Sequence, residues 1–225
     1  MDTLAQKAAI AQAKGDLPQA ATLLAPLHPN ADDTTAFGTQ VYQAILERHT
    51  AQIISRLQEV LTKPDPVLGY FNGQLRFCLG WAQEVAGDHA SAKESWRQAR
   101  GELEPFLQEQ SENYVLIGDL ALINMGLGDK AAALALSKRA MTVVPIEKDA
   151  VDGPSPIEIL ARVYAQIGEP DRAIAALRKV LSIPYAGPLA SNVPLTPALL
   201  RLDPMFDPLR HDPRFQKLIP KNLSE

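Results

Sequence analysis

The sequence IEILARVYAQIGEPDRAIAALRKV, residues 157–180, decides the fold of this chain. Its first half places apolar side chains on one face of a helix, Gly168 interrupts the pattern, and a second helical pattern follows. Leu160 and Ala161 precede the glycine by seven to eight residues, and Ala173 follows it by five. Small residues at these places let two paired helices approach closely. The stretch therefore predicts a helical hairpin that turns at Gly168.

The same hairpin pattern recurs upstream. Gly128 lies 40 residues before Gly168, and Gly87 lies 41 residues before Gly128. Two weaker copies turn at Gly15 and at Arg48, which stands in the place of the glycine. Copies that stay in phase predict a repeat protein, because each hairpin buries its apolar face mainly against its neighbours. Hairpins are expected over residues 3–27, 34–61, 73–103, 111–143 and 156–181.

Composition favours helices throughout the chain. Only 6% of the 225 residues are aromatic, and apolar residues do not alternate with polar ones over long runs. Both features favour helix over strand. We therefore expect an all-α fold without a sheet, in which residues 1–184 form an α-solenoid of about five hairpins.

Residues 185–225 depart from the repeat pattern. The stretch 185–194 is rich in Pro, Gly, Ser and Asn and predicts a loop. Thr196-Pro197 then predicts a helix start, because it combines an N-cap residue with proline at the first helical position. The same reasoning predicts short helices that cover the end of the array, starting at Asp203-Pro204, Asp207-Pro208 and Asp212-Pro213.

The last two copies resemble the tetratricopeptide repeat (TPR). The family unit has 34 residues, so spacings of 39 to 41 imply longer second helices or longer connections. Earlier copies depart from the pattern at Lys7, Arg48, Arg76 and Gln83. The positions that follow the pattern are Ile117, Leu120, Ala121, Gly128, Ala133, Ala140 and Pro145 in one copy, and Ile157, Leu160, Ala161, Tyr164, Gly168, Ala173, Leu177 and Val180 in the other.

Residues 111–219 are also similar to the TPR tail of bacterial multidomain signalling proteins. The stretches that carry this similarity are 148–154, 160–164 and 200–215. In those proteins the tail follows a serine/threonine kinase, a nucleotide-cyclase-like domain or a winged-helix domain. The resemblance implies the sensory or scaffolding half of a longer bacterial protein, and the favoured reading is a non-enzymatic scaffold that binds a protein or peptide. It leaves open a second reading, in which the chain is the regulatory part of a longer signalling protein and acts on its own effector domain.

The net charge and the hydropathy of the chain argue against nucleic-acid binding and against membrane insertion. A net charge of −4 argues against binding driven by a nucleic-acid backbone, which needs clustered Lys and Arg. No apolar run reaches the roughly 18 residues of a membrane span, and the N-terminal stretch lacks the layout of a secretion signal. We expect no membrane insertion and a cytoplasmic location, and the oligomeric state stays open.

Motifs of catalysis, cofactor binding and metal binding are not recognisable, so we expect no enzyme and no cofactor. Residues 126–131 match a degenerate Gly-x-Gly-x-x-Ala, but they form a hairpin turn with no strand before it. Asp149 and Asp152 flank a turn in which aspartate binds the backbone. The four histidines, scattered without a second ligand, are expected to be exposed turn residues: His28, His49, His89 and His211. Cys78 is expected to be a buried structural thiol.

In TPR folds the binding surface is the concave wall built by the first helix of each hairpin. In this chain that wall suits an apolar helix or an extended peptide from a partner protein. The alternative is that these residues are core, covered by a tightly wound solenoid or by an end of the chain itself. The repeat register assigns to the peptide-binding wall Tyr42, Ile45, Phe77, Trp81, Glu84, Leu122, Met125 and Arg162.

Overall fold

The computed structural model describes residues 3–30, 32–189 and 192–219, and these residues form helices and no strand. The predicted all-α class is therefore confirmed. The helices up to residue 180 come in pairs: α1 (Thr3–Lys14) with α2 (Leu17–Leu24), α3 (Thr34–Glu47) with α4 (Ala51–Thr62), α5 (Phe71–Val85) with α6 (His89–Glu109), α7 (Tyr114–Leu127) with α8 (Lys130–Val143), and α9 (Ser155–Ile167) with α10 (Pro170–Val180). A short 3-10 helix, η1 (Pro66–Leu68), precedes α5.

The turn inside each helix pair has a left-handed backbone. The φ angles are 81° at Gly15, 59° at Arg48, 83° at Gly87, 86° at Gly128 and 84° at Gly168. Glycine adopts this conformation without steric cost, whereas a residue with a Cβ is strained there. The turn at Arg48 thus has the same left-handed backbone as the other four turns, although its residue is not glycine.

Aspartate after three of these glycines begins the second helix of the pair. Each side chain accepts a hydrogen bond from the backbone N–H three residues ahead and so satisfies one of the donors that a helix start leaves free. These N-caps are Asp16, Asp88 and Asp129.

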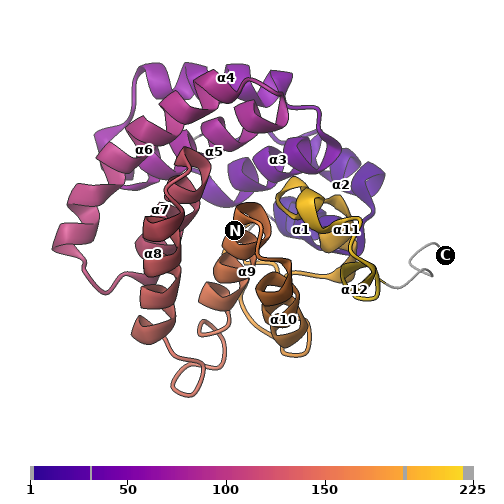
Figure 1. The fold of residues 1–225 in the computed structure, drawn as a ribbon. Helices are drawn as coiled ribbons and strands as arrows, with labels where there is room; N and C mark the ends of the chain where they lie inside the picture. The colour runs from indigo at the N-terminus through magenta and orange to yellow at the C-terminus, as the bar shows by residue number, and fades with distance from the viewer. Residues whose placement is uncertain (1–2, 31, 190–191, 220–225) are drawn as a thin grey trace.

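The first helices of the pairs form a row. Each of α1, α3, α5 and α7 contacts the next first helix, up to α9, and the second helices pack on the outside of this row. Figure 1 shows the resulting arc of helices, with the C-terminal helices α11 (Pro197–Leu202) and α12 (Pro213–Gln216) between its two ends. α11 contacts α1, and the 3-10 helix η2 (Pro204–Leu209) contacts α9. The C-terminal segment, residues 192–219, therefore bridges the first and last helix pairs.

Two details differ from the predicted helix bounds. Asp207-Pro208 does not start a helix of its own, because η2 already begins after Asp203, whose carboxylate accepts the N–H of Met205. The second helix of the third pair runs to Glu109 rather than ending near residue 103. Its last turns are held by apolar packing, since Phe106 lies edge-on to Tyr70 at 6.1 Å between ring centroids.

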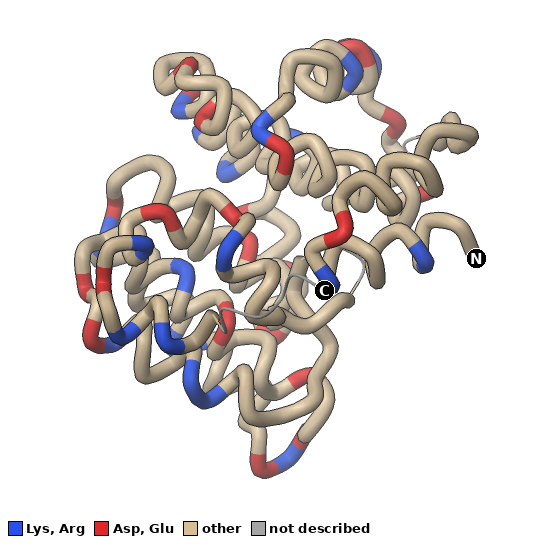
Figure 2. The backbone as a smooth tube through the Cα atoms, turned by 90° about the vertical axis from the view of Figure 1, so that its right-hand side faces the viewer, with Lys and Arg blue, Asp and Glu red and all other residues tan. Residues whose placement is uncertain are grey.

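Charged residues of both signs are interspersed along the chain (Figure 2). Within the described ranges, no helix combines the length and the apolar character that crossing a bilayer requires.

Trp96 on α6 lies in a slot between α5 and α7. A Cβ built on Gly80 would lie 2.5 Å from Cδ1 of the indole, and one built on Gly126 would lie 2.5 Å from its Cε3. The indole N–H donates to the backbone carbonyl of Phe77 at 3.3 Å. Three successive helices thus pack around one ring, and this close approach requires glycine at both positions.

We expect Gly80→Ala and Gly126→Ala each to lower the free energy of unfolding by about 1–3 kcal/mol, because the added methyl group overpacks a rigid ring. Gly101→Ala on the exposed face of α6 is the matched control. Its Cβ meets no atom within 4 Å, so alanine should stabilise the helix by up to about 1 kcal/mol. Urea unfolding followed by circular dichroism measures the free energy of unfolding of the three variants. Equal changes at all three positions would contradict the close packing of Trp96 against Gly80 and Gly126.

Candidate functional site

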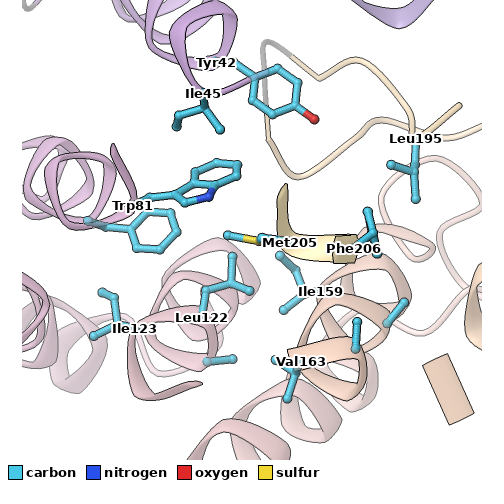
Figure 3. Packing of buried hydrophobic residues seen from close by; sticks show 14 of the residues in the cluster. Tyr42, Ile45, Trp81, Leu122, Ile123, Ile159, Val163, Leu195, Met205 and Phe206 are labelled. Atoms are coloured by element: carbon cyan, nitrogen blue, oxygen red, sulfur yellow. The ribbon is translucent and has the colours of Figure 1, made fainter. Parts of the chain in front are cut away.

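Most of the predicted peptide-binding wall is buried. Among its eight residues only Glu84 and Met125 are partly exposed, and the other six belong to the core: Tyr42, Ile45, Phe77, Trp81, Leu122 and Arg162. Figure 3 shows Met205 of the C-terminal segment beside Trp81 and Leu122. The burial of these six side chains favours the alternative that the sequence left open, in which they belong to the core, and Met205 of residues 192–219 packs beside them. Phe77 and Trp81 still line a cavity of about 350 Å³ together with Glu84 and Met125, so the binding role of this wall stays a prediction.

An ion-pair network fixes the C-terminal segment inside the arc. Arg162 on α9 donates from Nε and Nη2 to Oε1 of Glu158, at 2.9 and 2.7 Å, and from Nη1 to Oδ2 of Asp203 at 2.6 Å. The same oxygen of Asp203 accepts the hydroxyl of Tyr42 on α3 at 2.9 Å. All three charged side chains are at most 2% exposed. The network therefore joins the second helix pair, the last pair and the C-terminal segment.

The loop that leads into the C-terminal segment completes this network. The Tyr185 hydroxyl donates to the second oxygen of Glu158 at 2.5 Å and accepts the backbone N–H of Leu195 at 3.0 Å. Burial, and next the charge of Glu158, raise the pKa of Tyr185. Burial lowers the pKa of Arg162, but Asp203 and Glu158 together raise it well above its usual value. The guanidinium is therefore charged at every physiological pH.

Further contacts seat the C-terminal segment on both ends of the arc. Gln166 Nε2 donates to the carbonyl of Met205 at 2.7 Å, and the guanidinium of Arg162 lies 5.0 Å from the ring centroid of Phe206. At the other end, the Thr196 hydroxyl donates to the carbonyl of Ala13 on α1 at 2.6 Å. The segment is thus part of the folded core.

Two adjoining cavities of about 110 and 190 Å³ form a cleft beside this segment. The cleft is lined by α3, α5, α7, α9 and residues 186–189 and 192 of the loop before α11. Both cavities are lined by Asp119, Pro188 and Asn192. An engineered apolar cavity of about 150 Å³ is known to hold a benzene molecule, so the larger cavity has room for a small group.

Asp119 on α7 is the polar centre of this cleft. Its side chain is 8% exposed, and Oδ2 accepts a hydrogen bond from Nε2 of Gln74 on α5 at 2.7 Å. In the described part of the chain no Lys, Arg or His lies within salt-bridge distance of this carboxylate. Burial raises the pKa of Asp119 to about 6, and the hydrogen bond from Gln74 lowers it only in part.

Cys78, Tyr114 and Asp152 are the other titratable groups that line the cleft. Burial and then the charge of Asp119 raise the pKa of Cys78 to about 12, so this partly buried thiol stays protonated. Burial and then Asp152 raise the pKa of Tyr114 to about 12. Asp149 lies outside the cleft and accepts the backbone N–H groups of residues 151 and 152, which is the turn role predicted for it.

All four histidines are exposed, as predicted. His89 Nδ1 lies 2.9 Å from a carboxylate oxygen of Glu84, the one charged residue at the partly exposed edge of the predicted wall. The described residues hold no group of three or more His, Cys, Asp or Glu side chains placed to bind a metal ion.

Comparison with protein-family models, with curated proteins and with solved structures gave no match to this chain.

Sequence reasoning missed Asp119, although a signal for it was present. The residue interrupts the apolar run of α7, VLIGDLALI, where every neighbour within four positions is apolar or glycine. A lone carboxylate in such a helix is either paired, desolvated or functional. The predicted wall lay on the same row of helices but nearer the C-terminal segment.

We expect Arg162→Met to lower the free energy of unfolding by about 3–5 kcal/mol, because it leaves two buried carboxylates without their cation. Glu59→Ala is the control: it removes the acid of the exposed Arg56–Glu59 pair and should change stability by less than about 1 kcal/mol. Urea unfolding of both variants measures this difference. Similar values for the two would show that the network does not hold the C-terminal segment.

We expect Asp119→Asn to stabilise the protein in a pH-dependent way. The carboxyl has a pKa of about 6 in the folded chain, above its usual 3.8, so folding favours its protonated form. The contribution of Asp119 to the stability of the wild-type protein is therefore complete below about pH 4, and it is lost as the pH rises through about 6. At about pH 8 the variant should exceed wild type by about 3 kcal/mol, from about 1.4 kcal/mol per pKa unit. Unfolding of both proteins at pH 4 and pH 8 measures the difference in their stability. An equal difference at the two pH values would contradict the raised pKa of Asp119.

Proposed function

We propose that this chain is a non-enzymatic binding module of the TPR type, which takes a short segment of a protein partner in the cleft around Asp119. The observation that carries the proposal is the cleft itself. It is an open part of the inner wall, and it is lined by four of the five first helices. Small-molecule and peptide sites are typically concave, largely apolar and supplied with a few converging polar groups.

The stacking of the helix pairs supports a TPR-like α-solenoid. Each first helix contacts the next, and the turns repeat the same left-handed backbone at 33 to 41 residue intervals. In solenoids of this kind the row of first helices forms a continuous surface for extended partners.

The C-terminal segment is a second source of support, because it shows how this wall accommodates a polypeptide. Met205 and Phe206 insert as apolar anchors, and the carbonyl of Met205 is bonded by Gln166. A partner segment in the neighbouring cleft would use the same combination of side-chain anchors and main-chain hydrogen bonds.

The non-enzymatic reading has its own support. The buried charged cluster of Glu158, Arg162 and Asp203 is sealed in the core, and its members are bonded to one another. This cluster therefore has no access to a substrate.

Gly38→Phe tests the proposal, because Gly38 lines the larger cavity and a Cβ there meets no atom within 4 Å. Phenylalanine should fill the cleft while the helix stays intact. Gly101→Phe on the outer helix α6, whose Cβ is equally unobstructed, is the matched control. We expect a protein retained by the wild-type chain from a lysate of the source cell to be lost with Gly38→Phe and kept with Gly101→Phe, as identified by mass spectrometry. Equal retention by both variants would remove the cleft as the binding site.

A further inference from the structure

We propose that the cleft recognises a lysine side chain of the partner segment, with its ammonium group against Asp119 and its aliphatic stem along the apolar lining. This assignment rests on the proposed binding function and names the chemistry of the same site.

The charge of the cleft favours a cation. Asp119 and Asp152 are the charged residues of its lining, and neither cavity is lined by Lys or Arg. Asp119 is desolvated and has one neutral hydrogen-bond donor, Gln74, so its charge is uncompensated inside the protein. An incoming cation would supply the missing partner, and the low local dielectric would strengthen the contact.

The geometry of the carboxylate favours lysine over arginine. Oδ2 of Asp119 already accepts the hydrogen bond from Gln74, and Oδ1 accepts none from the described residues. Arginine binds a carboxylate best through two parallel hydrogen bonds, one to each oxygen, so its fork would have to share Oδ2 with Gln74. An ammonium group is a compact point charge that needs only one oxygen.

The walls of the cleft suit the methylene stem of lysine. The larger cavity is lined by Phe37, Val41 and Phe77, and the smaller one by Ile159 and by Val115, which is 37% exposed at the surface. Lysine commonly packs its stem on apolar surface while its charged end reaches a polar group. A neutral side chain of the same length would fill the space but leave Asp119 uncompensated.

The test is a titration of the full ¹⁵N-labelled chain, followed by amide chemical shifts, at about pH 8, where Asp119 is ionised. The probes are two end-blocked peptides, Ala-Ala-Lys-Ala-Ala and the same peptide with norleucine in place of lysine. We expect shifts centred on Asp119 and Gln74 and an affinity about tenfold higher for the lysine peptide. Asp119→Asn should reduce that ratio to less than about threefold, whereas the exposed control Asp171→Asn should keep it.

Three results would overturn the proposal: equal affinity for the two peptides, a lysine preference that survives in Asp119→Asn, or no shift with either peptide up to several millimolar. Binding of free pentylammonium without binding of the lysine peptide would also overturn it, because the site would then serve a small amine. A cellular partner that Gly38→Phe loses and Asp119→Asn retains would reject the lysine assignment while the proposed binding function stands.

Discussion

The structure depends on one guanidinium held between two carboxylates in the core. Removing Arg162, Glu158 and Asp203 from water is costly, and good geometry with additional hydrogen bonds is needed to offset that cost. Both conditions are met here, since the hydroxyls of Tyr42 and Tyr185 donate further hydrogen bonds to Asp203 and Glu158. Because these partners come from α3, from α9 and from the C-terminal half, the segment 192–219 is locked between the two ends of the arc.

A second carboxylate on the same inner wall has the opposite environment. Asp203 is paired and sealed, whereas Asp119 is desolvated, bonded to one neutral amide and set between two cavities. The difference follows from the path of the C-terminal segment, which packs over Asp203 and Arg162 but leaves the cavities around Asp119 open. The two carboxylates thus differ in what covers them, and the uncompensated Asp119 lies at the site proposed for a partner.

The local features of the fold could be predicted from the sequence. Apolar periodicity gave the helix pairs, and the five turn positions share a left-handed backbone, including Arg48, which the repeat register alone had placed there. Thr196, Asp203 and Asp212 cap the C-terminal helices as their Pro-containing pairs predicted. These features depend on residues only a few positions apart, so the local sequence is enough to predict them. The length of α6 was missed because tertiary packing of Phe106 extends it.

The site was decided by contacts between distant residues. An apolar side chain such as Trp81 fits an open groove and a core equally well, so the repeat register could place it on the inner wall but could not say what lies over it. Arg162 meets Asp203 across 41 residues of sequence, and Tyr42 meets it across 161. The sequence by itself determined the helices, their turns and their caps. Only the tertiary structure decided which part of the wall is core and which is open, because that depends on where the C-terminal segment returns to pack.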